Sequence, residues 1–259
     1  MLENLVAGLL NKYLGQFVQG LDTKQLNLSL WSGNLVLENL QVRETAFSEL
    51  DLPISVKAGT IGTLTLKIPW KNITTDPVVV LLDQVLVLAT PNLDLDYDAK
   101  LQERIAERSK RSKIAEYESL KLQREEAELG AQEKSDSFAV KMATKIIDNI
   151  QVKISNIHVR LEGDKINNAL PFAGGLTLAR LDLHSTDQTF EINSSNTSGD
   201  LFYKLAVLDS LSVYLNTATD MLNGMAAAQL FPKLANQIAR RDHAAPHNYI
   251  VEPISFTAE

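Results

Sequence analysis

Two stretches of alternating apolar and polar residues decide the fold of this chain: Gln25-Leu-Asn-Leu-Ser-Leu-Trp-Ser-Gly-Asn-Leu-Val-Leu-Glu-Asn-Leu-Gln-Val42 and Ile61-Gly-Thr-Leu-Thr-Leu-Lys-Ile-Pro-Trp70. Successive side chains of a β-strand point to opposite faces, so this alternation predicts strands with one apolar and one polar face. A tight antiparallel hairpin is expected at Ser32-Gly33-Asn34, between strands near 25–31 and 34–42. An apolar face that no other element covers must meet a ligand, a partner or a lipid.

The strand pattern continues on both sides of the middle of the chain. Strands near 53–58, 61–68, 78–82 and 84–89 are expected around the turn signals Ala58-Gly59-Thr60 and Asp76-Pro77, which gives an antiparallel meander of about six strands. After residue 150, further strands are predicted near 152–154, 157–161, 176–178, 181–183, 201–207 and 211–215. The sheet is therefore expected to resume after an insertion.

Helical periodicity fills the remaining segments. Residues 2–21 carry apolar side chains at a spacing of three and four, which predicts a helix that packs on the sheet; an interfacial membrane helix would need more cationic residues than Lys12. Residues 96–150 predict a helical pair broken at Gly130, whose charged first half includes the i,i+4 pair Glu107 and Arg111. A further helix is predicted over 217–240.

Composition excludes several functional classes. The chain has 259 residues, 45% of them hydrophobic, a formal net charge of -7 and no cysteine. A negative charge argues against nucleic-acid binding, and the lack of cysteine removes disulfides, zinc-thiolate sites and thiol nucleophiles. The longest apolar stretch, 78–89, is interrupted by Asp83 and Gln84 and is shorter than the roughly 20 residues of a membrane span.

No motif of catalysis or metal binding emerges from the residues. Phosphate loops, dinucleotide glycine patterns, nucleophile elbows and zinc-protease motifs are missing from the sequence. His243 and His247 have a metal-like spacing, but Pro246 between them favours a loop pair. His158 alternates with Ile157 and Val159 and is interpreted as a surface or sheet-face residue. We therefore expect no catalytic residues, no metal and no cofactor.

Several quoted motifs together resemble a known family. They recur in order along the chain: Leu10-Asn-Lys-Tyr-Leu-Gly15, Gln25-Leu-Asn-Leu-Ser-Leu-Trp-Ser-Gly33, Leu37-Glu-Asn-Leu40, Lys57-Ala-Gly-Thr-Ile-Gly-Thr-Leu64, Lys67-Ile-Pro-Trp70, Ile147-Asp-Asn-Ile-Gln-Val152, Ser155-Asn-Ile-His-Val-Arg160, Pro171-Phe-Ala173, Ser185-Thr-Asp187 and Tyr203-Lys-Leu205. This series resembles the amino-terminal chorein region of the vacuolar protein sorting-associated protein thirteen family. The segment 161–167 departs from it, because the family usually carries a longer acidic loop there.

The resemblance and the residue patterns together define an expected architecture. We expect an α+β fold in which a strongly curved antiparallel sheet, an N-terminal capping helix and a central helical pair form a scoop with an apolar concave face. Residues 1–95 would supply the first helix and meander, residues 96–150 the helical pair, and residues 151–259 the rest of the same sheet, a C-terminal helix and a tail. All three would belong to one continuous domain at the end of a longer protein.

The resemblance also implies a function and partners. In this family, which acts in vacuolar protein sorting, the full protein is a rod whose hydrophobic groove bridges two membranes, and this end faces the endoplasmic reticulum; related autophagy proteins share mainly the first block. The implied partners are glycerophospholipids, the endoplasmic reticulum surface and the remainder of the protein's own long chain, with no nucleic acid. The implied location is cytoplasmic, peripheral to the endoplasmic reticulum at organelle contact sites.

The apolar sheet face is the candidate site. We expect a non-enzymatic lipid transfer module whose groove shields acyl chains, at about 0.8 kcal/mol per buried CH₂. Two alternatives are a scaffold whose apolar face binds a partner protein and, less favoured for want of a nucleophile with its base, a lipid hydrolase. Strand parity selects ten floor residues: Leu64, Leu66, Ile68, Val85, Val87, Val152, Ile154, Val159, Leu161 and Leu205.

Overall fold

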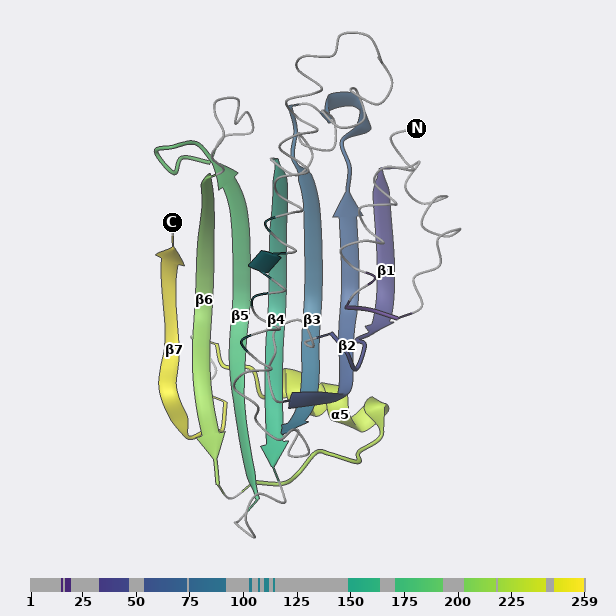
Figure 1. Cartoon of the computed structure of the whole chain (residues 1–259), viewed down its shortest axis with the longest axis vertical. Coiled ribbons are helices and arrows are strands. Elements are labelled where there is room, and N and C mark those ends of the chain that lie inside the picture. Colours follow the sequence, from purple (N-terminus) through teal and green to yellow (C-terminus); the bar gives the residue numbers. More distant parts are fainter. Residues whose placement is uncertain are drawn as a thin grey trace.

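In the computed structural model, the described residues form mainly one seven-stranded sheet (Figure 1). The structure describes residues 15, 17–19, 33–46, 54–73, 75–91, 103, 107, 110, 111, 114, 149–163, 171–192, 203–217, 219–240 and 245–258. The strands are β1 (Asn34–Gln41), β2 (Ile54–Lys67), β3 (Val78–Pro91), β4 (Ile150–Gly163), β5 (Phe172–Thr186), β6 (Tyr203–Asn216) and β7 (Tyr249–Ala258). A short 3-10 turn, η2 (Trp70–Asn72), follows β2, and the helix α5 (Ala227–Asn236) precedes β7.

The strands are ordered β1 to β7 as in the sequence, but the sheet is mixed. Strands β3 and β4 are parallel, with Val78 beside Ile150 and Ala89 beside Leu161, whereas all other neighbours are antiparallel. A parallel pair needs a long crossover connection, and residues 92–149 provide one here. The expectation of a wholly antiparallel sheet is therefore wrong at this pair.

Among the described residues, the strands are longer and fewer than the sequence pattern predicts, and the strand expected near 25–31 lies outside these residues. The strands expected at 53–58 and 61–68 form the single strand β2, and the later predicted pairs likewise merge into β3, β4, β5 and β6. Gly59 is not a turn but a position inside β2 that the Val42 side chain approaches closely, because an added Cβ would lie 2.7 Å from Val42 Cβ. The described residues thus form seven long strands in place of many short ones.

The sheet is also less curved than expected. Figure 1 shows its long strands side by side from β1 at one edge to β7 at the other, without strong curling. Seven strands with ordinary twist leave a sheet open, since closure needs more strands or a larger stagger. The expected scoop is therefore replaced, among the described residues, by an open twisted sheet.

One face of the sheet is covered near one end by α5. The side chains of Leu230 and Leu234 pack on Leu86 and Leu88 of β3, in a core that also includes Leu222. The helix is shorter than the predicted 217–240, since Gly224 with φ 88° and extended backbone at Ala226 precede it. Figure 1 shows α5 lying across the sheet near β3 and β4.

The other predicted helices fall mostly outside the described residues. Within 2–21, the helical expectation is wrong at Val18, which forms a β-bridge with Val42 and accepts a hydrogen bond from Arg43 Nε at 2.9 Å. Within 96–150, a few positions between 103 and 114 are helical, and the predicted pair of Glu107 and Arg111 is confirmed at 3.9 Å. The described ranges contain no helical pair.

Candidate functional site

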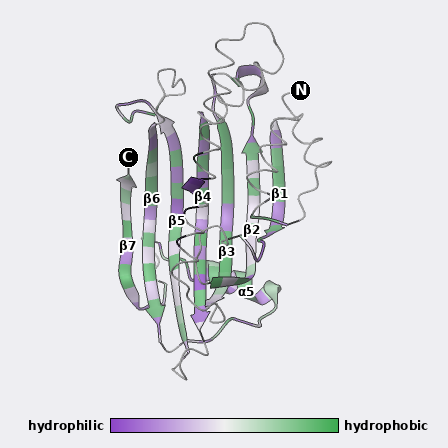
Figure 2. Cartoon of the chain, viewed as in Figure 1, coloured by the Kyte–Doolittle hydropathy of each residue, from purple (hydrophilic) through white to green (hydrophobic). Residues whose placement is uncertain are grey.

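Apolar side chains from every strand gather on one face of the sheet. The strand register aligns one row from β1 to β7: Leu37, Leu64, Leu82, Ile154, Leu181, Leu208 and Phe256. Nearer the other end of the strands, on the same face, a second row contains Val87, Val159, Leu176, Val213 and Val251. Figure 2 shows the resulting apolar and polar bands along the strands. We call this side the apolar face.

The apolar face is covered at one edge and open at the other. Around β1 to β3, Leu40, Ile61 and Leu64 form a buried core with Val18, and Val87 is 1% exposed. Toward β7, large apolar side chains are exposed on the same face: Leu176 (37%), Leu215 (40%), Val251 (36%), Ile254 (46%) and Phe256 (42%). The open part of the face therefore lies on β5, β6 and β7.

Most of the predicted floor residues lie on this face. The register and the alternation place nine of them there: Leu64, Leu66, Ile68, Val85, Val87, Val152, Ile154, Val159 and Leu161. Leu205 pairs with His184, next to the pair of Leu183 and Ala206, and so lies on the opposite face. Parity was ambiguous in this part of β6 because both sides of the strand carry apolar residues.

Parity also missed residues that belong to the face, among them Leu82, Leu181, Leu208 and Phe256. The signal that could have found the first three is a pair of apolar residues three positions apart, such as Leu82 and Val85. Such a spacing does not fit strict alternation, so the sequence pattern predicts the junction of two strands there.

The opposite face is sealed by a buried polar network beneath α5. The His158 Nδ1–H donates to the Leu234 carbonyl at 2.7 Å, and Tyr214 Oη–H donates to His158 Nε2 at 2.8 Å. Burial lowers the pKa of His158 to about 4 and raises the pKa of Tyr214 to about 12. His158 is thus on a sheet face, as expected, but it is fully buried and neutral, which corrects the surface interpretation.

An ion pair anchors the segment before α5 to the same face. Arg160 Nε donates to Glu162 Oε1 at 2.7 Å, and both side chains are fully buried. Glu162 also accepts hydrogen bonds from the backbone amides of Leu222 and Asn223, while Arg160 donates to the Asp220 carbonyl. Each charge is therefore compensated, and the pair tethers residues 220–223 to β4.

Of the two histidines with metal-like spacing, His243 and His247, only the second belongs to the described part of the chain. His243 lies outside the described residues, and His247 stacks on Tyr214 with ring centroids 3.7 Å apart. The His247 Nε2–H donates to the Gln237 carbonyl at 2.8 Å, and burial lowers its pKa. In the part of the chain that the structure describes, no three potential ligands come together for a metal ion.

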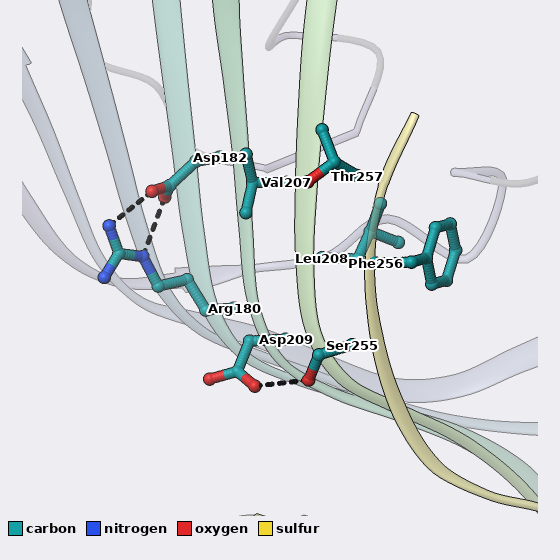
Figure 3. Close-up of a pocket in the computed structure, with 8 residues that line it drawn as sticks. All are labelled: Arg180, Asp182, Val207, Leu208, Asp209, Ser255, Phe256 and Thr257. Atoms are coloured by element: carbon teal, nitrogen blue, oxygen red, sulfur yellow. Dashed lines mark hydrogen bonds and ion pairs between the residues drawn. The ribbon is translucent and has the colours of Figure 1, made fainter. Parts of the chain in front are cut away.

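Beyond α5, the opposite face carries paired polar side chains around a shallow hollow (Figure 3). Arg180 Nε donates to Asp182 Oδ1 at 2.9 Å, and Ser255 Oγ donates to Asp209 Oδ1 at 2.7 Å. Although burial opposes ionisation of Asp182, the hydrogen bond and charge of Arg180 hold its pKa below the usual value. These groups are engaged with one another, so their arrangement is that of a structural polar surface.

The geometry defines a class of protein: a long open sheet with one extended apolar face and an opposite face that is sealed beneath α5, without a catalytic constellation among its described residues. The whole chain, residues 1–259, matches the VPS13-like family N-terminal region. The chain belongs to this family, as the quoted motifs predicted. Within the described ranges, no helix has the length and apolar character to cross a bilayer.

Curated relatives carry related names. The chain is 34% identical to the human intermembrane lipid transfer protein VPS13C and 36% identical to mouse VPS13A, with 100% and 99% of this chain covered. It is also 34% identical to the intermembrane lipid transfer protein VPS13 of Chaetomium thermophilum, with 100% of this chain covered. The chain spans about 8% of the length of each of these relatives. Their names denote lipid transfer between membranes.

Proposed function

We propose that the apolar face binds the acyl chains of glycerophospholipids and that the chain is a non-enzymatic module for moving them between membranes. The observation that carries the proposal is the set of exposed apolar residues on β5 to β7, including Leu176 and Phe256, which share one face. An exposed apolar patch of this kind marks a binding surface, and each acyl CH₂ that it removes from water contributes about 0.8 kcal/mol. The names of the relatives support lipid as the ligand.

The proposal extends to the setting of the transfer. It places the chain on the cytoplasmic side, peripheral to the endoplasmic reticulum at organelle contact sites, with 1–95, 96–150 and 151–259 acting as one unit. The remainder of a longer chain would carry the apolar face onward. Because tails contact the face while headgroups stay in water, we expect weak headgroup selectivity.

The first test is native mass spectrometry of the purified chain, followed by lipid extraction. We expect phospholipid to co-purify at close to one or more molecules per chain. A well-folded monomer that carries no lipid would contradict the proposal and favour the scaffold alternative, in which the apolar face binds a partner protein.

A matched pair of variants tests the face itself. Leu176 and Val207 are each 37% exposed, but Leu176 is on the apolar face and Val207, which pairs with Asp182, is on the opposite one. We expect Leu176→Glu to reduce transfer between phosphatidylcholine liposomes strongly and Val207→Glu to leave it near normal. Equal transfer by the two variants would mean that the apolar face is not the lipid-binding face. Leu66 and Val87 are each 1% exposed and would report on folding instead.

A further inference from the structure

Four residues inside strands adopt left-handed backbone at the same level of the sheet. They are Asn39, Gln84, Asn156 and Ser210, with φ between 55° and 57°. They lie in β1, β3, β4 and β6, which all run in the same direction. The register sets Asn39 and Gln84 on either side of Gly62 and aligns Asn156 with Gln84. The described residues of β2 and β5, which run the other way, have no positive φ.

Each left-handed residue reverses the side-chain alternation of its strand. Residues three positions apart then share a face: Leu37 and Leu40, with Leu82 and Val85, pack in a single core cluster. The neighbouring register places Ile154 and Ile157 of β4 beside Leu82 and Val85. A left-handed residue in a strand has this effect because it adds a local kink that shifts the two-residue period.

Uninterrupted alternation would place the wrong side chains on the apolar face. Counting back from Val85 in steps of two reaches Asp83, and counting back from Ile157 reaches Ser155 and Lys153. Those three polar residues instead line a hollow on the opposite face together with Arg180. The reversal therefore keeps a charged belt away from the apolar face at mid-strand.

Hydrogen bonds on the opposite face hold the kink in β4. Asn156 Nδ2 donates to Asp83 Oδ1 at 2.7 Å, and an Arg240 guanidinium N–H donates to Asn156 Oδ1 at 2.8 Å. In β6, the Ser210 amide donates to Ser255 Oγ at 3.0 Å. Asparagine tolerates left-handed backbone, whereas a β-branched residue is strongly disfavoured there.

We propose that Gln84, Asn156 and Ser210 are positioning residues that switch the strand alternation at one level, so that a lipid tail meets one uninterrupted apolar face. This inference rests on the proposed lipid-binding function. It predicts that the alternation of lipid contact along each of these strands changes phase at the left-handed residue.

The chain has no cysteine, so single cysteines can report lipid contact along β4. We would label cysteines at 152, 153, 154, 155, 157 and 159 with an environment-sensitive fluorophore and add phosphatidylcholine with brominated acyl chains as quencher. We expect quenching at 152, 154, 157 and 159 and none at 153 and 155. Quenching at 153, 155, 157 and 159 would overturn the phase change, whereas no quenching anywhere would overturn the lipid-binding function and this inference with it.

A pair of substitutions then tests the left-handed residue. Asn156→Gly and Asn156→Val both lose the side-chain hydrogen bonds, but only glycine keeps the backbone accessible. We expect the Gly variant to retain the quenching pattern, and the Val variant to lose quenching at 152 and 154 by at least about fivefold while 157 and 159 change by less than about twofold. Ala179→Val, opposite Asn156 in β5, is the control and should leave all positions unchanged.

Equal loss at all four positions in the Asn156→Val variant would indicate a merely structural role and overturn the positioning inference. Should that variant fail to fold, the cysteine scan of the unsubstituted strand still decides between the shifted and the uninterrupted pattern.

Discussion

The two faces of the sheet invert the usual relation between polarity and burial. On the α5 side, His158 and Arg160 are 0% exposed and Glu162 is 1% exposed, whereas on the apolar face Leu176 and Phe256 are 37% and 42% exposed. Burying charge is costly unless every group is paired, and here each has partners. Paired polar groups therefore help to close the face beneath α5, whereas apolar surface stays exposed on the other face.

The largest effect is expected from breaking the buried ion pair. Glu162→Ala would leave Arg160 uncompensated in a fully buried position and remove the acceptor for the amides of Leu222 and Asn223. We expect the free energy of unfolding to fall by about 3–5 kcal/mol. Denaturant unfolding of the variant and the parent chain measures this difference.

The exposed pair of Glu107 and Arg111 provides the control. Their side chains are 63% and 82% exposed, so Arg111→Ala should cost less than about 1 kcal/mol. Equal destabilisation by Arg111→Ala and Glu162→Ala would contradict the distinction between a buried and an exposed ion pair.

Truncating leucines on the two faces should give unequal losses. Leu234 of α5 is 0% exposed and packs in the core with Leu86, so Leu234→Ala should cost about 2–5 kcal/mol. Leu176→Ala, on the apolar face, should cost about 1 kcal/mol or less because the side chain is already partly in water. Thermal or denaturant unfolding of both variants without lipid measures the two losses. Equal losses would contradict the difference in burial between the two faces.

The sealed face should also make stability depend on pH. The pKa of His158 is about 4 in the folded chain against an ordinary value of 6.5, so the unfolded chain binds more protons between these values. The free energy of unfolding should therefore increase by about 3 kcal/mol from this residue as the pH rises across this window. Acidification through the same window should remove this stabilisation. The lowered pKa of His247 acts in the same direction.

Unfolding measured from pH 7 down to pH 4 checks the slope, and NMR titration of the His158 ring assigns it. A His158 ring that titrates near its ordinary value of 6.5 would show that α5 does not exclude water from this face.

The sequence was enough to predict the alternating strands and the family, and nine of the ten residues that parity selects share one face of the sheet. It did not show that Leu82-Asp83-Gln84-Val85 lies within one strand, because neither central residue is a glycine that would signal left-handed backbone. Strict alternation therefore predicts a turn at a place where the strand continues and only its side-chain alternation shifts by one residue. The same error shortened β4 and β6, where Asn156 and Ser210 interrupt the alternation.

The burial of residues beneath α5 could not be predicted from the sequence, for a reason other than the change of alternation. The pattern around His158 looks half-exposed by alternation, yet its cover comes from Leu234, far along the chain. The parallel pairing of β3 and β4 also depends on the path of a long connection, which no local pattern encodes. Periodicity identifies which residues share a face, whereas long-range packing determines which face is closed.

The smallest expected effect concerns the edge strand β7, where neighbouring side chains point to opposite faces of the sheet. Ser255 Oγ accepts from the buried Ser210 amide at 3.0 Å and donates to Asp209 at 2.7 Å, so Ser255→Ala would leave that amide without its acceptor. We expect a loss of about 1 kcal/mol in the free energy of unfolding and faster hydrogen exchange at Ser210. Thr257→Ala, at another exposed position of β7, should change stability by less than about 0.5 kcal/mol. Unchanged exchange at Ser210 in the Ser255 variant would show that the kink in β6 holds without this bond, and would leave the backbone of Ser210 itself as its cause.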